Sequence, residues 1–183
     1  IWYQSYTDPD EHREYIGRLD RFLQSVKDPG TTIDLKGLVP SAKHVHPLTE
    51  FRCAEQVIRN AIEAEREGYD AFIIGHFQDA GLNEAKSVVE IPVIGLGETS
   101  MLYACMLGRK IGLVTIDNIF IPWHEDQVVR YGLEKRVVGV RAAILDGVEV
   151  AAAARRIEAA EIARRAVLVT RVAALHRMRA EQR

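Results

Sequence analysis

Short apolar runs alternate with stretches of helical spacing from the first residue to about residue 140. Apolar side chains that recur every three or four residues predict helices, and short apolar runs bounded by turn residues predict strands. The segments expected as strands are 1–4, 32–38, 71–74, 91–94, 110–115 and 137–140. The segments expected as helices are 9–27, 53–67, 82–89, 99–107 and 122–131.

Three boundaries in this pattern depend on capping and turn residues. Asp8, with a proline directly after it, predicts a helix start in which Asp8 is the cap. Residues 39–50 are rich in proline and histidine and predict a loop. Residues 95–97 predict a glycine turn, with Thr99 or Ser100 as the cap of the next helix.

The alternation of strands and helices predicts an α/β fold. We expect a doubly wound, mainly parallel sheet with helices on both faces and right-handed crossovers. Ligands of such sheets bind beyond the carboxyl ends of the strands. This rule selects four segments that we expect to converge in space: 4–7, 75–81, 95–100 and 115–118.

Charge and composition exclude several classes of protein. The formal net charge of -2 and the pI of about 6.3 give no basic surplus for a nucleic-acid surface. No run approaches the ~18 consecutive apolar residues of a membrane span, and the opening residues predict a strand in place of a signal peptide. We therefore expect a cytoplasmic globular protein that binds neither membrane nor nucleic acid.

The composition changes near residue 141. From there Ala, Arg, Val, Glu and Leu dominate, and 151–165 predicts a strong helix with a solvated, arginine-rich face. We divide the chain into an α/β region, 1–140, and a mainly helical Ala/Arg-rich segment, 141–183, which packs on that region or completes it.

Three segments join a strand to a turn that carries candidate chemistry. In 70–82 an apolar strand runs into a turn with His76, and the amide N–H groups of the helix that follows can receive a carboxylate or an oxyanion. In 91–101 a strand ends in a glycine turn ahead of hydroxyl groups. The third segment, 107–115, reads Leu-Gly-Arg-Lys-Ile-Gly-Leu-Val-Thr.

Together and in this order, the three segments resemble the aspartate/glutamate/hydantoin racemase superfamily, and within it the hydantoin-racemase-like branch. The resemblance covers roughly 1–140. It implies two similar α/β lobes with the active site between them, no metal or pyridoxal cofactor, and a homo-oligomer. It also implies one cysteine from each lobe: one removes the substrate's α-proton as a thiolate, and the other returns a proton on the opposite face.

This sequence departs from the family pattern at both cysteine positions. Where the family has Cys-Phe-Gly-Asp, the chain has His76, Phe77, Gln78 and Asp79, so His76 stands in place of the first cysteine. Histidine is a competent base near neutral pH. The second cysteine would come after Val140, where the sequence contains none, so we expect an atypical or incomplete second lobe.

The chemistry that the resemblance implies is α-proton transfer. Such a proton is a weak acid, so its removal needs a base within ~3 Å and donors for the enolate oxygens. We predict a cofactor-independent isomerase, a racemase or epimerase acting on an amino-acid derivative such as a hydantoin or on Asp or Glu, with His76 as the catalytic acid or base. The alternatives are a decarboxylase or cis–trans isomerase of the same superfamily, for which one protonating group can suffice, or a non-catalytic protein that binds a small carboxylate or amide.

Further candidate substrate contacts lie at the expected strand ends. They are Gln4, Ser5, Phe77, Gln78, Asp79, Glu98, Thr99, Ser100 and Thr115. Helix capping is the competing role for Asp79, Thr99 and Ser100.

Two other histidine segments have weaker functional readings. His44 and His46 could bind a metal together with His76, but no fourth ligand is evident, so we expect a solvated loop and no metal site. Trp123 and His124 could close over the pocket; otherwise Trp123 packs inside and His124 is solvated.

Overall fold

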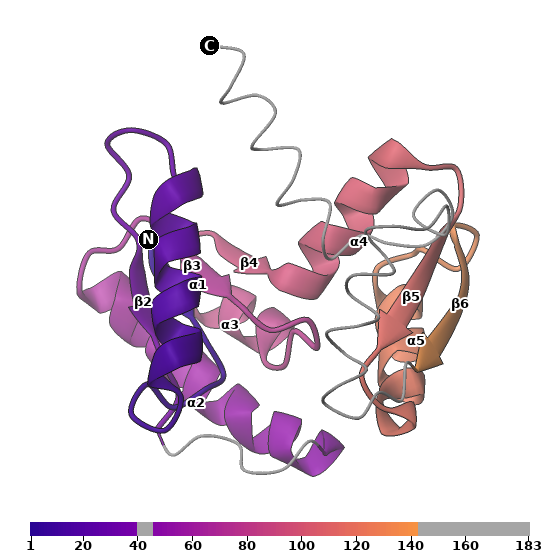
Figure 1. Ribbon diagram of the computed structural model, residues 1–183, viewed down its shortest axis with the longest axis horizontal. Coiled ribbons are helices and arrows are strands. Elements are labelled where there is room, and N and C mark those ends of the chain that lie inside the picture. The colour runs from indigo at the N-terminus through magenta and orange to yellow at the C-terminus, as the bar shows by residue number, and fades with distance from the viewer. Residues whose placement is uncertain (40–45, 143–183) are drawn as a thin grey trace. The chain divides into compact units, whose positions relative to one another are not determined.

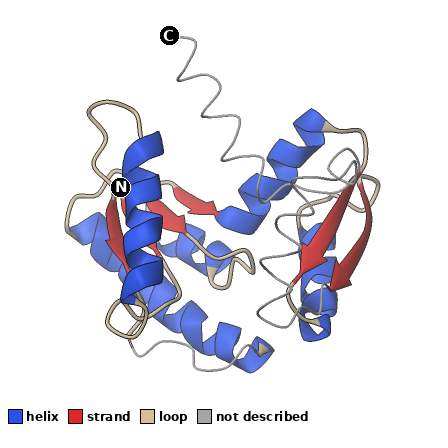
Figure 2. Ribbon diagram, in the orientation of Figure 1, coloured by secondary structure: helices blue, strands red, loops and turns tan. Residues whose placement is uncertain are grey.

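The computed structural model describes residues 1–39 and 46–142, and strands and helices alternate along them. The elements are β1 (Trp2–Gln4), α1 (Arg13–Val26), β2 (Asp34–Lys36), α2 (Pro47–Arg66), β3 (Phe72–Ile74), α3 (Leu82–Val88), β4 (Val93–Gly95), α4 (Leu96–Leu107), β5 (Ile111–Thr115), the short 3-10 helix η1 (Asn118–Phe120), α5 (Ile121–Arg130) and β6 (Val137–Ala142) (Figures 1 and 2). The described chain forms two compact units that meet at residues 99 and 100, within α4. The α/β class and the parallel sheet are confirmed. The segment 141–183 lies outside the described residues, apart from the end of β6.

The first unit contains a parallel sheet in the order β2-β1-β3-β4. The helix α1 leads outward from β1 to β2, whereas α2 and α3 lead the chain back across β1 to β3 and β4. Right-handed crossovers place α1 on one face and the mutually packed α2 and α3 on the other (Figure 1). The neighbouring strands β1 and β3 are therefore followed by connections in opposite directions, and their carboxyl ends form the switch point at which such sheets bind ligands.

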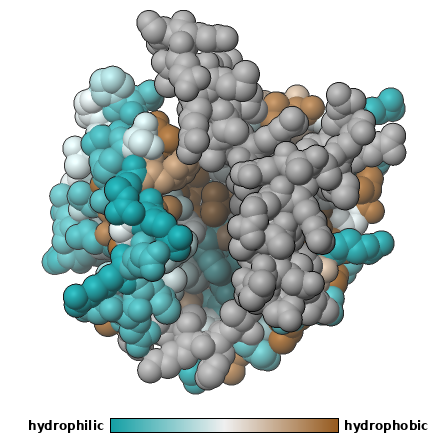
Figure 3. Space-filling model, in the orientation of Figure 1, coloured by the Kyte–Doolittle hydropathy of each residue, from teal (hydrophilic) through white to brown (hydrophobic). Residues whose placement is uncertain are grey.

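The core of the first unit lies between this sheet and α2. Phe72 and Ile74 of β3 are buried, and the α2 stripe that faces inward consists of small residues, Cys53, Val57 and Ala61 among them. Small side chains let the helix approach the sheet closely, and full burial of a side chain such as Phe72 stabilises the fold by roughly 1.5–3 kcal/mol. On the opposite face, α1 presents hydrophilic side chains to solvent (Figure 3).

The second unit contains the parallel pair β5–β6 with α5 packed against it. Ile111, Leu113 and Thr115 of β5 are buried, and the alternate residue Val114 is 57% exposed. The guanidinium group of Arg136 donates to the backbone oxygens of Cys105, Gly108 and Arg109, which satisfies carbonyl groups at the end of α4.

Three of the expected helix starts were wrong. The helix α1 begins at Arg13, because the Asp8 carboxylate instead accepts a hydrogen bond from the Asp10 N–H within a turn. The helix α2 begins at Pro47, inside the expected loop, because His46 caps it by accepting from the Leu48 N–H. The helix α4 begins directly after β4, without a glycine turn, so neither Thr99 nor Ser100 is its cap.

None of the helices described here has the length and apolar character that a bilayer crossing requires.

Candidate functional site

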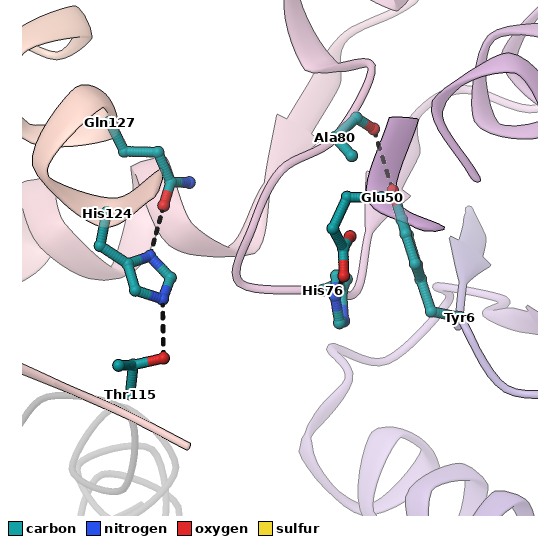
Figure 4. Close-up of polar contacts among 7 residues, drawn as sticks. All are labelled: Tyr6, Glu50, His76, Ala80, Thr115, His124 and Gln127. Carbon is teal, nitrogen blue, oxygen red and sulfur yellow. Dashed lines mark hydrogen bonds and ion pairs between the residues drawn. The ribbon is translucent and has the colours of Figure 1, made fainter. Parts of the chain in front are cut away.

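The candidate site lies at the switch point of the first sheet, where His76 follows β3 and Tyr6 follows β1. The two rings stack with centroids 4.1 Å apart and planes 14° from parallel. The hydroxyl of Tyr6, which is buried, donates to the backbone oxygen of Ala80 at 2.9 Å (Figure 4). Gly75 permits this approach of the two strands, because a Cβ there would lie 2.2 Å from the Tyr3 ring. The ring of His76 is therefore held against a fixed aromatic surface.

Glu50 gives His76 an acidic partner from a third segment. It lies in the first turn of α2, and its Oε1 is 3.1 Å from Nε2 of His76. The Glu50 side chain is 7% exposed and that of His76 is 29% exposed, so the acid is enclosed and the imidazole retains access to solvent. Within residues 1–39 and 46–142, the second carboxylate oxygen of Glu50 is buried and has no hydrogen-bond partner.

Cys53 lies one helical turn after Glu50 but does not supply a thiolate. Its side chain is buried, and burial, with a smaller contribution from Glu50, raises its pKa to about 11. The thiol therefore remains protonated near neutral pH. Burial likewise raises the pKa of Tyr6 well above its ordinary value, with further contributions from Glu50, Cys53 and Asp79. The hydroxyl of Tyr6 accordingly stays a donor.

Asp79 connects the β3–α3 turn to the start of α4. Its carboxylate accepts from the backbone N–H groups of Gly97 and Glu98 at 2.9 and 2.6 Å. The residue is 1% exposed and has a φ of 50°, a conformation that Asp and Asn adopt more readily than most residues. Asp79 thus caps α4 from eighteen residues away in the chain, and these two N–H groups are already occupied. Glu98 in addition pairs with Lys86 at 2.7 Å.

The polar residues at the end of β1 form bonds mainly within the sheet. The side-chain amide of Gln4 donates to the backbone oxygens of Ser5 and Lys36, and its oxygen accepts from Trp2 and Asn60. Gln4 is fully buried, and the hydroxyl of Ser5 lies 2.8 Å from that of Thr7. A part for Gln4 or Ser5 in substrate binding stays a prediction, and their contacts support the strand end on which Tyr6 stands.

In the second unit, Thr115 belongs to a buried polar chain with His124 and Gln127. Nε2 of His124 lies 3.0 Å from the Thr115 hydroxyl, and its Nδ1 lies 2.7 Å from the Gln127 side-chain oxygen (Figure 4). His124 is 3% exposed, so the expectation that it is solvated was wrong. An amide oxygen can only accept, so in neutral His124 the hydrogen is on Nδ1 and Nε2 accepts from the hydroxyl. The Thr115 hydroxyl therefore donates to His124, and its oxygen, at the end of β5, can still accept a hydrogen bond.

The structure thus gathers only some of the residues that the sequence singled out. His76, Gln78 and Asp79 lie in one turn at the switch point, with Gln78 and Asp79 buried and Phe77 half-buried beside them. Thr99 is exposed on α4, whereas Ser100 is buried and belongs, with Thr115, to the second unit. Sequence reasoning missed Tyr6 and Glu50, for which the available signals were an aromatic residue at a strand end and an acid in a first helical turn.

Two other features were considered as functional sites: the histidines His44 and His46, and a surface groove. His46 serves as a helix cap, His44 lies outside the described residues, and no group of three potential metal ligands occurs in the part of the chain that the structure describes. A shallow groove of about 620 Å³ lies between α1 and β2, with Arg13, Asp20 and Lys36 among its lining residues. Its described lining includes charged side chains and the end of β2 but no histidine, so we place the candidate chemistry at His76.

Comparisons with known proteins identify the family. The family model described as Asp/Glu/Hydantoin racemase matches residues 15–181. The chain belongs to this family. A hydantoin racemase from Pseudomonas sp. (strain NS671) is 37% identical over 92 residues, which are 50% of this chain and 37% of that protein. A hydantoin racemase from Rhizobium meliloti is 35% identical over 80 residues, 44% of this chain and 33% of that protein.

A solved structure supports the same fold. The allantoin racemase from Klebsiella pneumoniae superimposes with a TM-score of 0.71 at 24% identity, covering 87% of this chain and 68% of that one. The matched regions span about a third of the length of the two hydantoin racemases.

Proposed function

We propose that this chain belongs to a cofactor-independent racemase that acts on a hydantoin or a related amino-acid derivative, with His76 as an acid–base group for the α-proton. The observation that carries this proposal is the position of His76. It stands at the sheet's switch point, partly open to solvent, and is held by Glu50 and Tyr6 from two other segments. The names of the hydantoin racemases that share sequence with this chain support the substrate class.

The reaction assigned to His76 is proton transfer at carbon. A neutral imidazole takes the α-proton of the substrate, the electron pair of the C–H bond remains as an enolate, and the imidazolium formed is paired with Glu50. A histidine performs this step near neutral pH without the thiolate that the family resemblance would require. Protonated Cys53 gives no alternative base beside it.

The test follows solvent deuterium at the α-carbon by proton NMR together with optical rotation. The full chain is incubated with single enantiomers of 5-substituted hydantoins, allantoin, aspartate and glutamate in deuterated buffer. We expect exchange in the hydantoin group and a loss of at least about 100-fold in His76→Asn, since removal of a general base costs about 10²–10⁴-fold. His12→Asn changes an exposed histidine outside the site and should leave the rate unaltered.

Each outcome assigns a different function. Exchange with loss of optical rotation supports a racemase, and exchange with retained configuration supports a reaction that protonates one face only. Absence of exchange with all substrates, while the fold is intact by circular dichroism, would refute the catalytic proposal and favour a binding protein.

A further inference from the structure

The two ring nitrogens of His76 differ in their protein contacts. Nε2 lies 3.1 Å from Oε1 of Glu50, and no partner for Nδ1 is found among residues 1–39 and 46–142. An ionised carboxylate only accepts hydrogen bonds. When the imidazole is neutral, its single hydrogen must then be on Nε2, and the lone pair is on Nδ1.

The surroundings of Glu50 favour its ionised form. The residue lies in the first turn of α2, where the partial positive charge of the helix N-terminus stabilises an anion. One oxygen of Glu50 is buried and has no described hydrogen-bond partner. Protonation at this oxygen would replace an acceptor that lacks a partner by an O–H donor that also lacks one. The Glu50 carboxylate therefore acts as a hydrogen-bond acceptor toward Nε2 of His76.

Among residues 1–39 and 46–142, the ion pair found for Glu50 is with His76. The titratable groups that face one another here are Glu50 and Cys53 from α2, Tyr6 after β1 and Asp79 from the turn before α3. All of them are acids that are neutral or negative near neutral pH. Within this cluster His76 is the basic group, and it faces the Glu50 carboxylate.

The stacking contact completes the restraint. Nε2 is tethered to Glu50, and one face of the ring is held 4.1 Å from the Tyr6 ring, whose hydroxyl is anchored on Ala80. A ring that is fixed at one edge and on one face keeps its opposite edge in a defined direction. Nδ1 belongs to that remaining edge.

We propose that Glu50 is a positioning residue: it fixes His76 as the Nε2–H tautomer and leaves Nδ1 as the atom that takes the substrate's α-proton. The assignment of Nδ1 to the substrate rests on the proposed function, whereas the tautomer is a property of the protein alone. In the forward step the α-proton moves to Nδ1, the C–H electron pair stays on the substrate, and Nε2–H remains bound to Glu50. Inversion then requires that a second group protonate the opposite face of the enolate, because return of the proton from Nδ1 restores the starting enantiomer.

Two-bond proton–nitrogen correlation spectra of the full chain, labelled with ¹⁵N-histidine, test the tautomer directly. Comparison with His76→Asn assigns the His76 signals. In the neutral imidazole we expect a pyrrole-type signal for Nε2 and a pyridine-type signal for Nδ1. A wild-type His76 with its hydrogen on Nδ1 would overturn the inference without any variant of Glu50.

Glu50→Gln removes the charge and nearly preserves the shape. We expect a mixture of the two His76 tautomers, because an amide can either accept from or donate to Nε2. Glu55→Gln is the matched control, because Glu55 is exposed on the same helix and pairs with Arg59; it should leave the His76 tautomer unchanged. An unchanged tautomer in Glu50→Gln contradicts the positioning role.

The spectra test the role of Glu50, and the exchange assay tests the proposed function, so each proposal can be refuted without the other. Nε2–H in the spectra without deuterium exchange on any substrate would refute the proposed function and leave the role of Glu50 intact. Exchange that depends on His76, combined with Nδ1–H in the spectra, would refute the role of Glu50 and leave the function intact.

Discussion

Asp79 offers the sharpest test of how the first unit is held together. Asp79→Ala removes the carboxylate that accepts from the Gly97 and Glu98 N–H groups, of which the first is buried. A hydrogen bond to a charged group contributes about 1.5–3 kcal/mol net, and alanine at a φ of 50° costs roughly 1 kcal/mol more. Since neighbouring bonds do not add fully, we expect the free energy of unfolding to fall by about 4 kcal/mol.

Urea denaturation followed by circular dichroism measures this loss. Asp79→Asn keeps one acceptor and tolerates the left-handed backbone, so it should lose only about 1–2 kcal/mol. Asp117→Ala is the control, because Asp117 also accepts from a backbone N–H, that of Ile119 at 2.9 Å, but at an exposed position. It should cost less than about 1 kcal/mol. A loss below about 1 kcal/mol in Asp79→Ala, or equal losses in the Ala and Asn variants, would refute the capping argument.

Three further predictions concern packing and burial. Thr115→Val removes the hydroxyl that lies 3.0 Å from Nε2 of the buried His124 and should lower the free energy of unfolding by about 1–3 kcal/mol, whereas Thr115→Ser should restore most of it in the same denaturation assay. Gly95→Ala would place a Cβ 2.7 Å from the Asp79 carboxylate and should lower the free energy of unfolding by about 1–3 kcal/mol. Gly17→Ala, in a helix with space around it, should instead raise the free energy of unfolding by about 0.5–1 kcal/mol. A higher melting temperature for Gly95→Ala than for Gly17→Ala would contradict both. Because burial raises the pKa of Cys53, the folded chain keeps a proton that the unfolded chain releases from pH 9.0 upward. The free energy of unfolding should therefore fall between pH 9.0 and about 11, by up to about 3 kcal/mol more in the wild type than in Cys53→Ala. Parallel pH profiles of the two proteins would exclude this cause.

Much of the fold could be predicted because its signals are local. Buried side chains are recognisable in the sequence itself, as in the apolar run before His76 and in the stripe of small residues along α2. The helix starts were harder, because their caps come from unexpected groups: His46 caps α2, and Asp79 caps α4 across the sheet edge. A rule that looks for Ser, Thr, Asp or Asn beside the helix does not find either one.

In the candidate site, one residue could be predicted from the sequence and its partners could not. His76 could be found from the sequence, because a polar residue directly after a buried strand lies at the sheet edge where ligands bind. Its partners could not, since Glu50 and Tyr6 are remote in the chain and look like an ordinary helical acid and a strand-end aromatic. The buried pairing of His124 with Thr115 was missed because a histidine near a helix start gives no sign of its burial.

The sequence by itself determined the α/β class, the family resemblance and the replacement of a cysteine by His76, because strand and helix periodicity and motif order are written along the chain. Only the tertiary structure decided which groups surround that histidine. The order β2-β1-β3-β4 brings the end of β1 beside the end of β3, and α2 places Glu50 against the same point. An imidazole becomes an oriented base through the charge and the aromatic ring that chain folding sets beside it, and those contacts exist only in three dimensions.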